Sequence, residues 1–309
     1  MKKNNAVEIA ILGVLGLLAI LTLVIPSLFR DRNEVPLLSL SVLLRDTDTT
    51  NWMVARQGME QAADEFGAEL RFLTLTVQND SREQEELLRR EAEGGAAALV
   101  VVPINPEGLY TAWLRLASPC PVVTMECHME GEAGVVSPDN EQVGIRLAGA
   151  LLEDWDRGDV ILLDTSAACP EVSSRLEAAQ NALTEAGVSA VRLTALPEGP
   201  VDAGWVMAFD MSATRQAAEK KETEAQSYAL YGVGCSSAIT VQLERGNITA
   251  IAAWSDYAAG YLAVQQAVQS VRGQSKVLDP LRFSIIRGED IYAPENQKLL
   301  FPVMSSSGR

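Results

Sequence analysis

The chain has 309 residues, of which 48% are hydrophobic and 21% are charged, and its 25 basic and 41 acidic side chains give a formal net charge of −16. This length and apolar content are typical of a folded protein with one large or two smaller domains, and they exclude a disordered chain. The acidic balance argues against nucleic-acid binding, because phosphate backbones are recognised by basic surfaces. A single histidine, His128, excludes the histidine-rich sites of zinc enzymes.

The amino terminus contains the longest apolar segment. Residues 9–29 are uncharged and mostly apolar, close to the roughly 20 residues that span a bilayer. No A-x-A-like cleavage site and no nearby cysteine follow, so we expect an uncleaved signal-anchor helix with its linker over residues 1–35. Basic residues are balanced on its two sides and do not fix the orientation. Since such an anchor usually exports the domain behind it, we expect a single-pass cell-membrane protein whose soluble domain is extracytoplasmic.

Strand and helix signals alternate through the first half of the soluble part. Apolar runs predict strands at 38–44, 70–77, 97–102 and 121–125. Periodic patterns predict helices at 52–66, 81–94 and 106–117. Ser81 and Gln84 have the spacing of a capping box at the start of the second helix. The third strand is almost wholly apolar, which is typical of a parallel sheet covered on both faces.

The alternation continues through the second half. Strands are predicted at 159–163, 188–193, 205–209, 227–231, 248–254 and 283–286. Helices are predicted at 141–155, 172–186, 212–224 and 256–271. This order predicts an α/β fold with parallel, doubly wound sheets. Two sheets, divided near residues 125–138, fit the length better than one.

The sequence contains no complete motif for catalysis or nucleotide binding. It has no P-loop and no G-x-S-x-G, and Gly232-Val233-Gly234 lacks the third glycine of a dinucleotide turn. Four cysteines at 120, 127, 169 and 235 match no zinc pattern and fix no disulfide connectivity. We therefore expect neither an enzyme nor a bound metal or cofactor. A binding protein remains, with its ligand at the carboxyl ends of the strands.

A series of short segments occurs in a fixed order between about residues 38 and 300. They are 40–44, 51–52, 57–59, 62–63, 67–68, 102–106, 121–126, 137–140 with Gly144, 175–177, 182–183, 232–234 and 258–264. In this order the chain resembles the periplasmic sugar-binding proteins of the ribose-binding type. The resemblance implies a type I periplasmic binding protein fold, in which two Rossmann-like lobes are joined by hinge strands. It places residues 36–126 and about 255–309 in the N-terminal lobe and about 127–254 in the C-terminal lobe.

The resemblance also implies ligand contacts in both lobes. Trp52 corresponds to an aromatic residue that stacks on a sugar face, and Asp48 and Thr49 correspond to polar contacts in the same loop. Glu126 corresponds to a carboxylate that accepts hydroxyl protons. Arg175 corresponds to an arginine of the second lobe that donates to ring hydroxyls.

Four further positions show where this chain follows the family and where it departs. Asp210 matches an Asn or Asp contact, but Cys127 replaces the usual arginine beside the first carboxylate. Cys235 replaces an Asp or Asn, and Trp254 replaces a hinge-side Gln or Asn. Exchanging a charge for a thiol leaves a more apolar wall, which favours a less polar or aromatic-bearing ligand over a common pentose or hexose. The connection over 193–205 is also too short for the helix that the family usually has there, so it is trimmed or rerouted.

These features predict a membrane-anchored solute-binding protein for a carbohydrate or a related small molecule. Its partner would be an ABC transporter permease or a membrane sensor kinase. The altered pocket also allows a ligand-free scaffold or sensor subunit of a membrane signalling complex. A transcription regulator built on the same two lobes would need a DNA-binding helix-turn-helix where this chain has an apolar span, so no nucleic-acid partner is expected.

Overall fold

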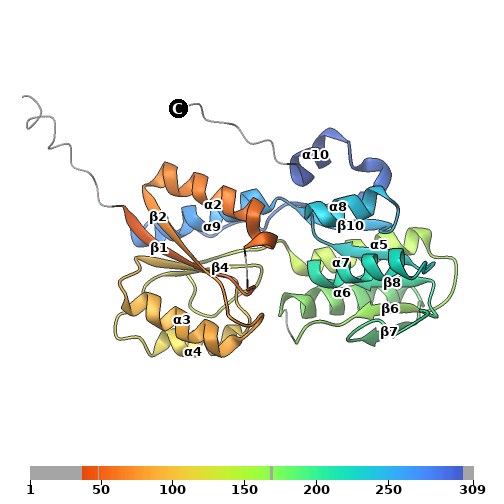
Figure 1. Cartoon of the computed structure of the whole chain (residues 1–309), viewed down its shortest axis with the longest axis horizontal. Helices are drawn as coiled ribbons and strands as arrows, with labels where there is room; N and C mark the ends of the chain where they lie inside the picture. The colour runs from red at the N-terminus through yellow and green to blue at the C-terminus, as the bar shows by residue number, and fades with distance from the viewer. Residues whose placement is uncertain (1–36, 48, 168–169, 302–309) are drawn as a thin grey trace, which may run out of the picture. The chain divides into compact units, whose positions relative to one another are not determined.

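The computed structural model describes residues 37–301, apart from Asp48 and residues 168–169. The anchor expected over residues 1–35 therefore lies outside the described residues. Within the described part, no helix is both long enough and apolar enough to cross a membrane. By their internal contacts, residues Leu38–Arg309 form one structural unit, and this unit contains two β-sheets (Figure 1).

The first sheet, in the described residues, consists of five parallel strands in the order β2-β1-β3-β4-β5. They are β1 (Leu38–Leu43), β2 (Ala68–Leu73), β3 (Ala98–Val101), β4 (Val122–Met125) and β5 (Gly134–Val136). Every side chain of β3 and β4 is buried, as the continuous apolar pattern predicts. The short edge strand β5 was not predicted.

Helices cover both faces of the first sheet. One face packs on α2 (Met53–Phe66), which follows a 3₁₀ turn η1 (Thr50–Trp52), and on α9 (Asp256–Val271). The other face packs on α3 (Ser81–Glu93) and α4 (Pro106–Leu114). A Cβ atom at Gly260 would lie 1.9 Å from the Ala55 carbonyl oxygen, and one at Gly58 would lie 2.0 Å from that of Tyr257. These glycines let α2 and α9 approach closely, so a helix from late in the chain completes the first lobe.

The capping box predicted at the start of α3 is wrong. Asp80 is the capping residue, and its Oδ1 accepts hydrogen bonds from the backbone N–H groups of Arg82 and Glu83. Gln84 instead turns into the core, where its side chain bonds the carbonyl of Val102 at 2.8 Å and the N–H of Ile104 at 3.0 Å. An aspartate one position earlier is an equally good cap. The buried amide of Gln84 supplies hydrogen-bond partners for the backbone groups that follow β3.

The second sheet has six described strands in the order β11-β10-β9-β8-β6-β7. They are β6 (Val160–Leu163), β7 (Ala190–Leu193), β8 (Trp205–Ala208), β9 (Ala229–Val233), β10 (Ala250–Trp254) and β11 (Phe283–Arg287). All pairs are parallel except β10 with β11. Residues 194–204, which are all described, contain neither helix nor strand. The connection between β7 and β8 is thus trimmed, as the sequence predicts.

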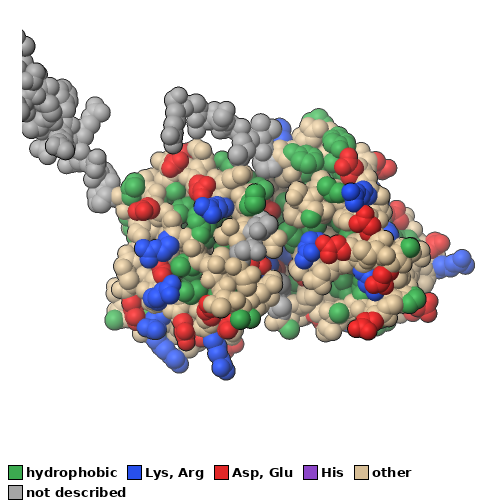
Figure 2. Space-filling view, viewed as in Figure 1, with side chains coloured by type: hydrophobic (Ala, Val, Ile, Leu, Met, Phe, Trp, Pro, Cys, Tyr) green, Lys and Arg blue, Asp and Glu red, His purple; other side chains and the backbone are tan. Residues whose placement is uncertain are grey.

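Helices also lie on both faces of the second sheet. One face carries α5 (Asn140–Asp154) and α6 (Glu171–Glu185). The other carries α7 (Met211–Thr223), α8 (Ser237–Glu244), a 3₁₀ turn η2 (Gly288–Asp290) and α10 (Pro294–Leu300). Helices α8 and α10 were not predicted. On the face seen in Figure 2, acidic and basic side chains are intermixed, and no extended surface of one charge is visible there.

The described backbone passes between the two sheets three times. It crosses after β5, after β10, and again between α9 and β11. Two crossing segments lie side by side, since the Leu281 N–H donates to the Ser137 carbonyl at 2.9 Å. The expected division gave residues 255–309 to the first lobe. Helix α9 packs there, but β11 pairs with β10 in the second sheet, and β5 at 134–136 extends the first sheet beyond residue 126.

Candidate functional site

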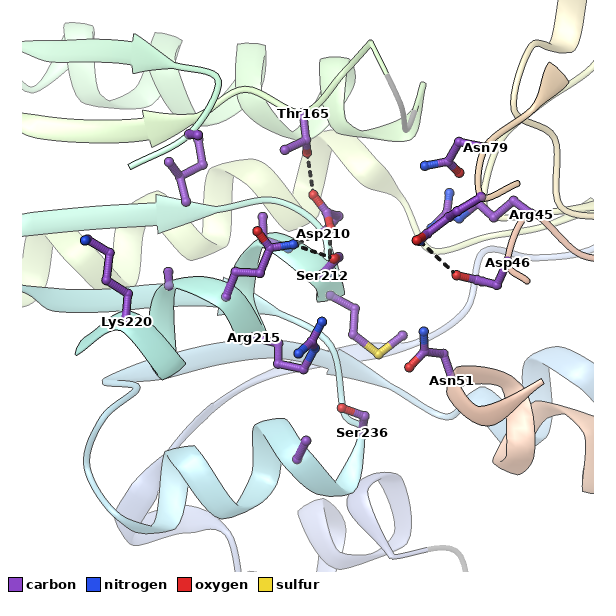
Figure 3. A pocket seen from close by; sticks show the side chains of 18 of the residues that line it. Arg45, Asp46, Asn51, Asn79, Thr165, Asp210, Ser212, Arg215, Lys220 and Ser236 are labelled. Atoms are coloured by element: carbon purple, nitrogen blue, oxygen red, sulfur yellow. Dashed lines mark hydrogen bonds between the residues drawn. The ribbon is translucent and has the colours of Figure 1, made fainter. Parts of the chain in front are cut away.

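A cavity of about 710 Å³ lies where loops of the first lobe face loops of the second (Figure 3). Arg45 and Asp46 reach it from the loop after β1. Thr165 and Asp210 reach it from the ends of β6 and β8. Its other lining side chains include those of Asn51, Trp52, Gln78, Asn79, Ser212, Arg215, Gln216, Lys220 and Ser236. Both the volume and the convergence of hydrogen-bonding groups from several strand ends are typical of a small-molecule site.

Arg45 connects the two lobes through ion pairs with two glutamates. Its Nη2 lies 2.9 Å from Oε2 of Glu126, which follows β4 in the first lobe. Its Nη1 lies 2.9 Å from Oε1 of Glu171, the first residue of α6 in the second lobe. The three side chains are 13%, 18% and 1% exposed, so these pairs are largely removed from water.

The two glutamates differ in protonation. Burial raises the pKa of Glu126 to about 8; the Arg45 charge opposes this shift, and the neighbouring Glu171 reinforces it. Burial acts in the same direction on Glu171, but attraction to Arg45 and Arg175 outweighs it and holds the pKa of Glu171 below its ordinary value. At neutral pH Glu126 therefore mostly keeps its proton and Glu171 is ionised. The pair carries about one negative charge beside the Arg45 guanidinium.

Arg175 is fixed inside the second lobe. Its Nε donates to Asn140 Oδ1 at 2.7 Å and its Nη1 donates to the Phe209 carbonyl at 2.8 Å. The guanidinium lies over the Trp254 ring, 5.1 Å from the centroid. Arg175 is 2% exposed, and its Nη2 has no hydrogen-bond partner among the described residues. Arg175 and Trp254 were both predicted at the site, and they are in contact.

Asp210 is held by the protein itself. Its Oδ1 accepts hydrogen bonds from the backbone N–H groups of Ser212 and Ala213 at 2.8 and 2.9 Å, which caps α7. Its Oδ2 accepts a hydrogen bond from the Thr165 hydroxyl. The carboxylate lines the cavity, and it also has a structural role at the start of α7.

Trp52 lines the cavity from the first lobe. It is 7% exposed, and its Nε1 donates to Asp46 Oδ2 at 2.5 Å. Asp46 also accepts a hydrogen bond from Gln78 Nε2 at 3.2 Å, which fixes the loop after β1. Thr49 is half-buried outside the cavity lining, and its carbonyl accepts from the Trp52 N–H at 3.0 Å. Asp48 lies outside the described residues.

The two cysteines predicted at the site are free thiols that do not line the cavity. Cys127 Sγ lies 3.8 Å from the Pro103 carbonyl, and Cys235 Sγ lies 3.2 Å from Asp256 Oδ2. Burial raises the pKa of both thiols and raises the pKa of Asp256 to about 6. Neutral, buried thiols are poor nucleophiles and poor metal ligands. In the described residues, no three His, Cys, Asp or Glu side chains are grouped to hold a metal ion.

The sequence reasoning did not select Arg45, Asp46 or Glu171. It predicted an apolar wall at Cys127, whereas Arg45 supplies a guanidinium to the adjacent Glu126 from another strand end. Arg45 and Asp46 directly follow the first predicted strand, and their position at the carboxyl end of a parallel strand could have identified them. Glu171 has no such local signal, because its role depends on a contact between the lobes.

Comparison with known proteins agrees with this architecture. A sequence profile described as "Periplasmic binding protein domain" matches residues 40–275. No curated protein matches the sequence. A carbohydrate transporter solute binding protein from Agrobacterium radiobacter, solved in complex with D-arabinose, superposes with a TM-score of 0.76 at 15% identity, covering 86% of this chain and 100% of its own.

Two other solved structures show the same likeness. GanP, a glucose-galactose binding protein from Geobacillus stearothermophilus, gives a TM-score of 0.73 at 19% identity and covers 83% of this chain and 99% of its own. A chain of the XylFII-LytSN complex gives 0.71 at 16% identity, covering 82% and 100%. At these identities the superpositions establish a shared fold, and they confirm the predicted α/β architecture with parallel sheets.

Proposed function

The chain belongs to the periplasmic binding protein domain family, and on that premise we propose that it binds a small polar solute, a sugar or sugar-like molecule, between its two lobes. The observation that carries this proposal is the cavity lined by polar side chains of both lobes and by the indole of Trp52. Sugars present hydroxyl edges and apolar ring faces, and such a lining has groups for both. The D-arabinose and glucose-galactose binding proteins of the same fold support this choice of solute.

Within this proposal the ligand contacts are of two kinds. Trp52 offers an apolar face, while Thr165 and Asp210 offer hydrogen-bonding groups at the cavity wall. Arg175 is buried outside the cavity lining, and its Nη2 has no hydrogen-bond partner among the described residues, so we assign it a supporting position behind the cavity wall. Four other predicted residues lie outside the cavity lining: Glu126, Cys127, Cys235 and Trp254. They support the cavity wall without touching the solute, and Thr49, in the loop before Trp52, has the same role. Asp48 is kept as a ligand contact on the resemblance alone.

We place the protein on the extracytoplasmic side of the cell membrane, anchored by the apolar run at 9–29, where it presents its solute to an ABC transporter permease. The run has the length and composition of a membrane span. A tether of this kind raises the effective concentration of the binding domain at its membrane partner.

One observation favours a second function, a scaffold or sensor subunit of a membrane signalling complex. Arg45 of the first lobe pairs with Glu171 of the second, so the protein's own side chains join the lobes beside the cavity. The likeness to a chain of the XylFII-LytSN complex is compatible with a partner other than a permease.

A thermal-shift screen of the full chain against pentoses, hexoses, polyols and nucleosides tests the first function. A solute at about 100 times its dissociation constant should raise the free energy of unfolding by about 2.7 kcal/mol. Asp210→Asn should abolish most of that shift, whereas Asp64→Asn, at an exposed position of α2, should leave it unchanged. If no solute stabilises the protein, solute binding is refuted and the scaffold function is favoured.

A further inference from the structure

The contact between the lobes is centred on a charged group of the protein itself. The Arg45 guanidinium lies 2.9 Å from a carboxyl oxygen of Glu126 in its own lobe and 2.9 Å from one of Glu171 in the other lobe. Glu171 is 1% exposed, and its second oxygen, Oε2, has no hydrogen-bond partner among the described residues. Arg45 therefore provides the hydrogen-bonded countercharge of a carboxylate that belongs to the opposite lobe.

We propose that Arg45 is a built-in latch whose guanidinium holds the two lobes together when no solute is bound. Arg45 also lines the cavity, so the latch lies at the wall of the proposed solute site. The inference goes beyond the proposed function, because it concerns the protein without any solute.

The physical reason lies in what burial does to the two glutamates. When the lobes are together, the carboxyls of Glu126 and Glu171 are both removed from water. Without Arg45, this state would bury the ionised Glu171 beside Glu126 with no bonded countercharge, which is strongly unfavourable. When the lobes separate, both carboxyls reach water and need no partner. Arg45 thus stabilises the joined state more than the separated one, which is the condition for shifting the equilibrium.

Other charged groups near the cluster do not replace the latch. Arg175 is the second cation that acts on both glutamates, but its bonded contacts are to Asn140 and to the Phe209 carbonyl within its own lobe. The aromatic ring that it lies against, Trp254, also belongs to the second sheet. Arg45 is the residue that bonds carboxyls of both lobes.

Separation of the lobes can be measured by the reactivity of two native cysteines, so no cysteine has to be introduced. Cys127 is next to Glu126, is 8% exposed and is close enough to feel the Glu171 charge from the other lobe. Cys120 is half-buried beside Trp113 within the first lobe. Separation of the lobes should expose Cys127 and leave Cys120 unchanged, whereas unfolding should expose both.

The test measures the rate at which N-ethylmaleimide modifies each cysteine of the full chain in the absence of solute, read by peptide mass spectrometry. Arg45→Gln and Glu171→Gln should each accelerate Cys127 modification by at least about tenfold, with the Cys120 rate unchanged. Arg89→Gln, which removes an exposed helical arginine, should retain the wild-type rates.

An unchanged Cys127 rate in both Arg45→Gln and Glu171→Gln overturns the latch. If the modification of Cys120 is also faster in Arg45→Gln, that variant has lost its fold. The test of the latch then rests on Glu171→Gln, which keeps Arg45 and its bond to Glu126. Because no solute is present, the result is independent of the screen that tests solute binding. If no solute stabilises the protein in the thermal-shift screen but Cys127 modification is faster in the variants, solute binding is refuted and the latch is supported.

Discussion

The guanidinium of Arg175 in α6 lies over the indole ring of Trp254 at the end of β10, with 5.1 Å between the guanidinium carbon and the ring centroid. A cation over an aromatic face is attracted by the ring quadrupole, and the attraction is greater where both groups are desolvated. The resemblance predicts that Trp254 replaces an amide side chain of the family. In the structure the tryptophan gives the arginine an aromatic face to lie against.

Arg175→Ala should lower the free energy of unfolding by about 3 kcal/mol, because it leaves Asn140 Oδ1 and the Phe209 carbonyl without their donor and removes one of the two positive charges beside Glu171. Arg175→Lys should recover only part of this loss, since an ammonium cannot reproduce both directed bonds. Urea unfolding measures both variants. Arg89→Ala, at an exposed position of α3, is the control; equal losses for Arg175 and Arg89 would contradict a buried structural role.

Two glycines on α5 should respond in opposite ways to alanine. A Cβ at Gly144 would lie 2.1 Å from the Arg175 carbonyl oxygen, so Gly144→Ala must push α5 away from α6 and should cost about 1–3 kcal/mol. A Cβ at Gly149 meets nothing within 4 Å, and Gly149→Ala should stabilise the helix by about 0.5–1 kcal/mol. Urea midpoints compare the two variants directly. Stabilisation by Gly144→Ala would show that the helices do not meet there.

The sequence predicted most of the sheet framework because buried parallel strands are continuous apolar runs. Helix α9 was predicted with the bounds it has, Asp256–Val271, since its apolar pattern is long and regular. Strand β5 has three residues and α8 has eight, and segments that short show too little periodicity to be recognised. The return of β11 to the second sheet was missed because strand pairing is a tertiary contact.

The site was predictable only in part, for a related reason. The resemblance predicts Trp52, Asp210 and Arg175 as ligand contacts, and the first two line the cavity. Arg45 and Glu171 form an ion pair between residues 126 positions apart. No local pattern encodes such a pair, so the contact between Arg45 and Glu171 could be found only in three dimensions.

The pH dependence of stability should reveal the proton on Glu126. Burial raises its pKa from 4.5 to about 8, so the folded protein holds this proton more tightly than the unfolded chain. The resulting stabilisation is complete below about pH 4.5 and is lost as the pH rises through about 8. Glu171, with a lowered pKa, acts in the opposite sense and loses its contribution as the pH falls.

Glu126→Gln removes the first effect only. Wild-type stability should therefore fall relative to this variant between about pH 5 and 8, as measured by urea unfolding at a series of pH values. Glu130→Gln, an exposed change in the same loop, should follow the wild-type curve. Parallel curves for wild type and Glu126→Gln would show that Glu126 is ionised throughout this range.

Asp210 should contribute to stability through its cap on α7. Asp210→Ala removes the acceptor for two backbone N–H groups and should cost about 1–2 kcal/mol. Asp210→Asn keeps a good capping side chain and should cost a small fraction of that. Urea unfolding and amide exchange in the first turn of α7 measure the difference. Equal losses for alanine and asparagine would place the role of Asp210 in its charge rather than in the cap.

Trp52 should contribute to solute affinity, if the chain binds a sugar as we propose. Its indole lines the cavity, and stacking on a sugar face is lost in Trp52→Ala, so affinity should fall by about ten- to a hundredfold for a solute found by thermal shift. Trp52→Phe keeps an aromatic face but loses the hydrogen bond to Asp46, and it should retain most of the affinity. Calorimetric titration measures both, with Trp113→Phe, which lies outside the cavity lining, as the control. Unchanged affinity in Trp52→Ala would mean that the solute binds elsewhere in the protein.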